Sequence, residues 1–266
     1  MSQQLPPDFS PWEQNIPVPP PQRKRAGVRM VILTLVLIVA VAVILHESVL
    51  QIRNVAIIGN RDIQWEEIVH LAGLDGKVSY FAVSEEKIRA GINSHRYLEF
   101  QKIEKEFPGN VTIYLKERKP WANVQVMGVM FLLDEEGYVL ERLDSAQLQE
   151  GLITVTGFQA KEVRLGNQIV PGTQRQLEVY IELMQELALQ NYAGEVAELN
   201  LSDPDNLYLV TRDREAYPAH LGDSEDLRAK IGTLRAVIAK LREMGKYGGV
   251  IEASVPAVAT YTPVDL

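Results

Sequence analysis

The chain has 266 residues and a formal net charge of −8. It contains no cysteine, which excludes disulfides and thiol catalysis and leaves His and carboxylate side chains as the candidate metal ligands. Four of the 27 basic and two of the 35 acidic residues precede His46, so the remainder carries a net charge of −10. Such an acidic remainder argues against nucleic acid as a ligand and against tight binding of anionic headgroups beyond the basic segment.

An apolar run from Met30 to Leu45 follows a basic cluster of Arg23, Lys24, Arg25 and Arg29. With the preceding residues the stretch reaches about 20 residues, the length of a membrane-spanning helix. We therefore predict a transmembrane helix at residues 26–46. The positive-inside rule makes it a single-pass type II anchor, with the N-terminus in the cytoplasm and the bulk outside. The alternative is a cleaved secretory signal, but the run exceeds the usual ~7–15 apolar residues of such signals.

Residues 1–25 are predicted to be a disordered cytoplasmic tail, because seven of the fourteen prolines fall before residue 22 and core-forming residues are few. The segment Pro17–Pro21 (PVPPP) has the composition of a polyproline ligand for a cytoplasmic partner, but an unstructured spacer is the simpler interpretation and is preferred.

The first external stretch, residues 50–119, has a mixed pattern of strands and short helices. Ser84 is placed as an N-cap, with Glu85 and Glu86 in the first helical turn. The predicted order is β-α-α-β-β, and the elements are a strand at Gln51–Ile58, helices at Gln64–Ala72 and Ser84–Asn93, and strands at Leu98–Phe107 and Val111–Leu115.

Three segments of this stretch resemble the extracytoplasmic POTRA module of the FtsQ/DivIB family of bacterial cell-division proteins. They read VAIIGN, then AGLDGKVSYFAVSEEKI, then FPGNVTIYLKERKPWA, in the order and spacing of that family. The resemblance extends over nearly the whole chain beyond residue 28. It implies a POTRA module at 50–119 and the family's β-domain at 120–266.

Residues 120–266 are predicted to be a mostly antiparallel β-domain with two amphipathic helices. The overall fold class is therefore α+β: one transmembrane helix, a POTRA module and a β-domain. The helices are expected at Gln174–Asn191 and Ser224–Met244. The strands are expected at Trp121–Val126, Val129–Leu133, Tyr138–Glu141, Leu152–Thr156, Val196–Leu201 and Leu207–Thr211, with one or two more between Val250 and Thr262.

Apparent catalytic signals have simpler interpretations. Ser84 and Lys87 have the S-x-x-K spacing of penicillin-binding serine enzymes, but the other motifs of those enzymes are missing and helix capping explains the serine. The four histidines are scattered without metal-ligand spacing. We therefore predict no catalytic residue, no metal, no cofactor and no small-molecule substrate.

The leading functional hypothesis is a noncatalytic scaffold of the divisome, enriched at the division septum. The resemblance implies that its partners are single-pass coiled-coil division proteins of the FtsB (or DivIC) and FtsL types, which link it to septal peptidoglycan synthases. Two alternatives remain open at this point. One is a cell-wall enzyme, and the other is an extracytoplasmic POTRA-type chaperone of protein transport.

The partner-binding surface is predicted in one final strand from about Val255 to Thr262. Pro256 lacks a backbone donor and favours an edge position, and the segment carries no charge, so it suits capture of a partner strand. The resemblance points to the same strand. Alternatively, Tyr261 and Val258 pack on the helix at Ser224–Met244. The predicted binding residues are Val255, Val258, Ala259, Thr260, Tyr261 and Thr262.

Overall fold

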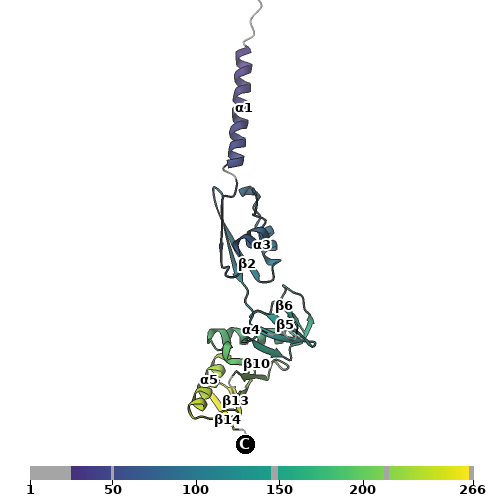
Figure 1. Ribbon diagram of the computed structural model, residues 1–266, viewed down its shortest axis with the longest axis vertical. Helices are drawn as coiled ribbons and strands as arrows, with labels where there is room; N and C mark the ends of the chain where they lie inside the picture. Colours follow the sequence, from purple (N-terminus) through teal and green to yellow (C-terminus); the bar gives the residue numbers. More distant parts are fainter. Residues whose placement is uncertain (1–24, 49–50, 145–148, 213–215, 264–266) are drawn as a thin grey trace, which may run out of the picture. The chain divides into compact units, whose positions relative to one another are not determined.

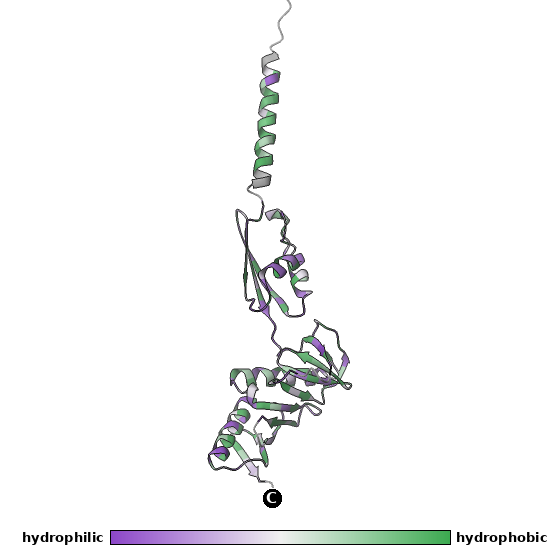
Figure 2. Ribbon diagram, viewed as in Figure 1, coloured by the Kyte–Doolittle hydropathy of each residue, from purple (hydrophilic) through white to green (hydrophobic). Residues whose placement is uncertain are grey.

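The computed structural model describes residues 25–48, 51–144, 149–212 and 216–263. The tail predicted at 1–25 lies, except for Arg25, outside the described residues. Helix α1 (Arg25–Ser48) is one of two separate units, and the second comprises residues 51–266. Within α1, the window Gly27–Ile44 has a mean hydropathy of 2.8, and none of it is buried. Most of this helix is green in Figure 2, with one purple turn near its N-terminal end. Its length and composition are those of a membrane span.

The module that follows α1 has the predicted β-α-α-β-β order (Figure 1). Its three-stranded sheet has the order β1-β3-β2, in which β1 is parallel and β2 antiparallel to β3. Both helices contribute to one core, which includes Ile68, Ile88 and Ile113. The elements are β1 (Asn54–Ile58), α2 (Trp65–Leu71), the 3-10 turn η2 (Tyr80–Ala82), α3 (Glu85–Asn93), β2 (Leu98–Glu106) and β3 (Asn110–Glu117).

Local chemistry sets the helix and strand limits of this module. The Ser84 hydroxyl accepts a hydrogen bond from the Lys87 backbone N–H, which confirms the predicted N-cap. The predicted start of the first strand at Gln51 was wrong by three residues. Gln51 forms an isolated bridge with Ser79, and the Ile52 N–H donates to the Val78 carbonyl, so the chain is bonded to a loop before it joins β3 at Asn54.

The rest of the chain forms one nine-stranded sheet with the order β14-β13-β12-β11-β10-β7-β4-β5-β6. Its larger elements are β4 (Ala122–Val126), β5 (Val129–Leu133), β6 (Val139–Leu143), β7 (Ile153–Thr156), α4 (Gln174–Leu189), β10 (Val196–Asn200), β11 (Leu207–Thr211), β12 (Pro218–Gly222), α5 (Leu227–Glu243), β13 (Val250–Val255) and β14 (Val258–Thr262). A two-stranded sheet of β8 (Ala160–Glu162) and β9 (Val170–Pro171), and the 3-10 turn η3 (Ala193–Glu195), complete the described elements.

The large sheet is mixed, with five antiparallel and three parallel neighbouring pairs among the described strands. Two of the parallel pairs, β7 with β10 and β12 with β13, are joined by crossovers that contain α4 and α5. Parallel neighbours require such long connections. The sequence predicted neither β12 nor its pairing, because Pro218 and Gly222 bound a segment of only five residues.

Helices α4 and α5 pack on the large sheet and form the main core with it. On α5 the predicted apolar face is confirmed, since Leu227, Ile231, Leu234, Ile238 and Leu241 are all buried. Each such side chain contributes about 1.5–3 kcal/mol on burial. On α4 the apolar face predicted at Leu177, Ile181, Met184, Leu187 and Ala188 is buried at Leu177, Met184 and Leu187 and partly buried at Ile181 and Ala188. The buried face is wider than predicted, because Val179, Tyr180 and Leu183 are also buried.

The loop between β12 and α5 is fixed by a buried lysine. The Lys230 side chain is only 2% exposed, and its Nζ donates to the Asp223 carboxylate at 2.6 Å and to the Asp223 carbonyl at 3.0 Å. The predicted helix start at Ser224 was three residues early, because Asp226 has a φ of 50° and is not helical. The hydrogen bond from Lys230, followed by one from the backbone at Glu225, lowers the pKa of Asp223.

An ionic cluster joins the first module to the large sheet. Arg118 follows β3 and is 6% exposed. Its guanidinium contacts Asp134 at 2.6 Å and Glu99 at 3.0 Å, and lies 3.5 Å from the centre of the Tyr138 ring. Asp134 also accepts hydrogen bonds from the backbone at Glu136 and Tyr138. One buried cation therefore contacts groups from both sheets.

Replacing Arg118 should destabilise this junction strongly. Arg118→Ala leaves the buried Asp134 carboxylate without its guanidinium, and loss of one partner of a buried pair typically costs about 3–5 kcal/mol. We expect a loss of about 3 kcal/mol in the free energy of unfolding of the detergent-solubilised protein, measured by urea denaturation. The control Lys119→Ala removes the next, exposed cation and should stay within about 0.5 kcal/mol of the parent. Equal stability of the two variants would contradict the assigned role.

The Asp223–Lys230 contact should make stability depend on acid pH. Because folding lowers the pKa of Asp223, its stabilising contribution is complete above the pKa of the unfolded chain and disappears as the pH falls through the folded value. Asp223→Asn should therefore be less stable than the parent at neutral pH, and the difference should narrow below about pH 4. Urea titrations at several pH values measure it. The exposed control Asp62→Asn should show no such convergence, and a pH-independent difference for Asp223→Asn would refute the linkage.

Candidate functional site: the β14 edge

The final segment is a hairpin of two strands. β13 and β14 are antiparallel, with Ile251 opposite Tyr261, Glu252 opposite Thr260 and Val255 opposite Val258. The single strand predicted at Val255–Thr262 was therefore wrong at its start. Val255 ends β13, and Pro256 and Ala257 form the turn, in which Ala257 has a φ of 60°. Pro256 thus carries no information about which strand is at the edge.

The sheet order nevertheless places β14 at one edge of the nine-stranded sheet. Among the residues that the structure describes, no strand pairs with its outer side. An uncovered edge presents unpaired backbone N–H and C=O groups, which are a template for a further strand. Parallel pairing of β13 with β12 sets this arrangement, because α5 carries the chain across the sheet before the hairpin forms.

Side chains of β14 alternate between the core and solvent. Ala259 and Tyr261 are partly buried against the main core, whereas Val258, Thr260 and Thr262 are exposed. The helix-packing alternative thus applies to Tyr261 and does not apply to Val258, which is 58% exposed. Of the predicted binding residues, β14 brings together Val258, Ala259, Thr260, Tyr261 and Thr262, with Val255 across the turn.

Tyr261 is seated over a glycine. A Cβ atom at Gly249 would lie 2.7 Å from Cε2 of the Tyr261 ring and 2.6 Å from the Thr262 carbonyl oxygen, and Gly249 has a φ of +88°. Only glycine fits this close approach and this backbone conformation. The ring therefore has a structural role in holding β14 flat on the sheet.

The hairpin is apolar and almost uncharged on its outside. Val250, Val255 and Val258 are exposed hydrophobic side chains, and Tyr247 is exposed just before β13. Glu252 is the one charged residue between Val250 and Thr262. Edge strands are usually protected by charges or by covering segments. The chemistry of this edge therefore favours a partner that supplies backbone hydrogen bonds and apolar side chains.

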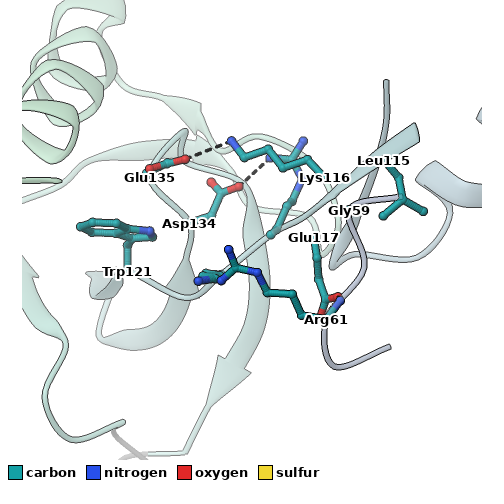
Figure 3. Close-up of a pocket in the computed structure, with 10 residues that line it drawn as sticks. Gly59, Arg61, Leu115, Lys116, Glu117, Trp121, Asp134 and Glu135 are labelled. Carbon is teal, nitrogen blue, oxygen red and sulfur yellow. Dashed lines mark hydrogen bonds and ion pairs between the residues drawn. The ribbon is translucent and has the colours of Figure 1, made fainter. Parts of the chain in front are cut away.

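A hollow of about 420 Å³ lies between β3 and the turn after β5, away from the β14 edge in the sequence (Figure 3). Its charged side chains are largely paired with one another: Lys116 contacts Glu135 at 3.0 Å and Glu136 at 2.7 Å, and Arg118 contacts Asp134. Burial opposes the charged form of Lys116, but these hydrogen bonds outweigh it and raise its pKa to about 12. The hollow belongs to the ionic junction, and we assign it no ligand.

The described residues also include no group of three or more His, Asp or Glu side chains placed to hold a metal. Ser84, the serine of the S-x-x-K spacing, is engaged as the cap of α3. The β14 edge is therefore the surface that we carry forward as the candidate site.

Known proteins match both the POTRA module and much of the chain beyond it. An FtsQ-type POTRA domain matches residues 50–118. The cell division protein DivIB of Clostridium tetani is 23% identical over 76% of this chain and 76% of its own length. The cell division protein FtsQ of Syntrophotalea carbinolica is 23% identical over 80% of this chain and 76% of its own length.

Among solved structures, the major extracytoplasmic domain of the trans isomer of DivIB from Geobacillus stearothermophilus matches 48% of this chain and 97% of its own, at 16% identity and a TM-score of 0.32. The sequence matches to DivIB and FtsQ proteins extend well beyond the POTRA module. With the β-α-α-β-β module, the mixed sheet and the N-terminal apolar helix, they lead to one conclusion. The chain is a homologue of the FtsQ and DivIB cell division proteins, with an FtsQ-type POTRA domain at residues 50–118.

Proposed function

We propose that this FtsQ/DivIB homologue is a membrane-anchored scaffold of the divisome whose β14 edge receives a strand from a single-pass partner of the FtsB or DivIC type. The observation that carries the proposal is the edge itself: β14 is unpaired on its outer side within the described chain, and its exposed residues Val258, Thr260 and Thr262 are uncharged. Through this partner and an FtsL-type protein, the scaffold connects to septal peptidoglycan synthases.

Strand addition accounts for the chemistry of this surface. Each backbone hydrogen bond of an added strand contributes about 0.5–1.5 kcal/mol net. Cross-strand side-chain pairs with Val258, Thr260 and Thr262 add about 0.2–1 kcal/mol each. Residues Val255 and Val258 at the turn extend the apolar contact beyond the strand. The backbone bonds supply affinity, and the alternating side chains select the partner.

Tyr261 has two roles in this proposal. Its ring packs on Gly249 and the main core, and the residue belongs to the strand that the partner is proposed to join. Aromatic side chains of this amphipathic kind are enriched among binding hot spots. Because the ring is also structural, its truncation alone cannot separate binding from folding.

A pair of proline variants in β14 tests the edge. Successive backbone N–H groups of a strand point to opposite sides, so of Ala259→Pro and Thr260→Pro one removes a donor to β13 and the other a donor to the partner. The variant that removes the donor to the partner should keep the parental melting temperature. Its dissociation constant for the partner's external segment should rise by more than about tenfold, which is 1.4 kcal/mol.

The control for this test is Met127→Ser, which changes an exposed side chain in the turn between β4 and β5 and should leave binding unchanged. Binding can be measured by titration of the purified partner segment against the full protein in detergent. If Ala259→Pro and Thr260→Pro both fold and both bind the partner segment as tightly as the parent, β14 is excluded as the partner surface.

The proposed location is the cell membrane, with the N-terminus in the cytoplasm and enrichment at the septum. Support comes from the exposed apolar helix α1 and from the basic residues Arg23, Lys24, Arg25 and Arg29 on its N-terminal side. No acidic residue lies between Asn15 and His46 to offset this charge asymmetry.

Protease added to spheroplasts should therefore degrade the external part while sparing an N-terminal tag. A fluorescent protein fused to the N-terminus should label the septum of dividing cells. Recovery of a soluble, secreted form that begins near Glu47 would show that the apolar segment is a cleaved signal and would exclude the anchor.

A further inference from the structure

Three segments meet at the end of the POTRA module where the chain enters it. Gln51 bridges to Ser79, and the Ile52 N–H donates to the Val78 carbonyl at 2.9 Å. The Arg53 N–H donates to the carbonyl of Gly109, in the turn between β2 and β3, at 2.8 Å. The entry strand therefore lies directly against the loop at 78–82 and the turn at 107–109.

Exposed aromatic rings gather at this same end. Phe81 is 70% exposed and Phe107 is 60% exposed. Tyr80 lies between them, with edge-to-face ring contacts at 5.6 Å to Phe81 and 5.8 Å to Phe107. A single exposed Phe needs no explanation, but two Phe rings around one Tyr form an apolar surface without a cover among the described residues. The remaining Phe of the module, Phe100, is buried in its core.

The covalent chain brings this surface close to the membrane. The apolar helix α1 ends at Ser48, and residues 49 and 50 alone connect it to Gln51. An extended chain advances at most about 3.6 Å per residue, so Gln51 lies within about 11 Å of Ser48. The polar headgroup layer of a bilayer is about 5–8 Å thick on each side of the apolar core. The aromatic end is therefore within reach of the headgroups of the bilayer that holds α1.

We propose that Tyr80, Phe81 and Phe107 form an interfacial anchor that inserts into the headgroup region of the outer face of the membrane and docks the POTRA module on it. The occupant of this aromatic surface is thus the lipid bilayer. Tyr and Trp concentrate at this depth in membrane proteins, because their rings have an apolar body and a polar tip, and Phe supplies apolar contact at the boundary of headgroups and acyl chains in interfacial segments. The inference rests on the proposed anchoring by α1 and is independent of strand capture at β14.

The charges around the rings are balanced, so the docking is apolar in character. In the loop, Lys77 follows Asp75, and in the hairpin Lys105 is flanked by Glu104 and Glu106. Asp75 is itself paired with His70 at 2.7 Å. We therefore expect the docking to be insensitive to the content of anionic lipid, in contrast to binding by a polybasic segment.

A site-directed nitroxide tests the proposal, because the chain has no cysteine and a single introduced one is unique. Ala82 is exposed next to Phe81, so Ala82→Cys places the label at the surface without removing a ring. The full chain is reconstituted in phosphatidylcholine vesicles. Collisions of the label with oxygen, which enters the bilayer, are compared with collisions with a water-soluble nickel chelate.

Two reference sites calibrate the depth. Val36→Cys, within α1, reports the bilayer interior, and Arg61→Cys, beyond the opposite end of β1 from Gln51, reports water. We expect the oxygen-to-nickel ratio at residue 82 to exceed that at residue 61 several-fold, with or without added phosphatidylglycerol. Phe81→Ser in the Ala82→Cys background should return the ratio to the value of residue 61, and Phe81→Trp should preserve it.

The possible outcomes separate this inference from the anchor. An aqueous ratio at residue 82 with a deep Val36 site overturns the docking and leaves the anchor intact. An aqueous Val36 site overturns both. A ratio at residue 82 that rises only after a partner protein is added assigns the rings to a protein interface and also overturns the proposal. Because Phe81 is exposed, the serine variant should keep the parental melting temperature, and Phe107→Ser provides a second test of the same surface.

Discussion

The crossover through α5 is the constraint on which the candidate site depends. Parallel pairing of β12 with β13 obliges the chain to traverse the sheet before it can return, and the buried face of α5 stabilises that path. Lys230 and Asp223 fix the loop at the start of the crossover. Once β13 lies beside β12, the short turn at Pro256 and Ala257 leaves β14 no position other than the edge. Packing at some distance from the surface thus determines which backbone groups are offered to a partner.

Each of the two sheets has its own apolar core, and they are joined by the ionic cluster at Arg118 and by Tyr97, which packs on the small apolar cluster of Leu132, Leu140 and Leu143. The POTRA core and the main core are separate sets of buried side chains, and the contacts at Arg118 are ionic and aromatic. A buried ion pair adds less to stability than to the uniqueness of a geometry, because desolvation offsets much of its attraction. The ionic contacts at Arg118 therefore fix the orientation of the two sheets more than they add to the free energy of folding.

Much of the fold could be predicted from the sequence because its signals are local. The capping serine before α3 and the apolar periodicity of α5 each act within a few residues, and each placed its element to within about three residues. The strand β12 was missed because it begins with Pro218 and ends with Gly222, which leaves an alternation of only three residues between two types that are depleted in strands. Its identity as a strand arises from pairing with β11 on one side and with β13 on the other.

The candidate site also combines local sequence signals with contacts between segments distant in sequence. The uncharged composition of Val255–Thr262 pointed to a segment that includes an edge strand, but the argument from Pro256 did not hold, since that residue lies in the turn. That Tyr261 rests on Gly249 could not be read from the sequence, because the contact depends on the register of the terminal hairpin. Sequence reasoning proposed this segment as the partner surface, and the tertiary pairing shows which of its side chains are exposed.

The position of β14 after every other described strand also has a consequence for the order of biogenesis. Synthesis and export proceed from the N-terminus, so the edge can form only after β12, α5 and β13 have emerged and packed. A chain interrupted between the POTRA module and β13 would retain the apolar helix and that module but would offer no such edge. If β14 captures a strand as proposed, capture would therefore require that β12, α5 and β13 have already packed, and chains that lack them could not compete for the partner at that surface.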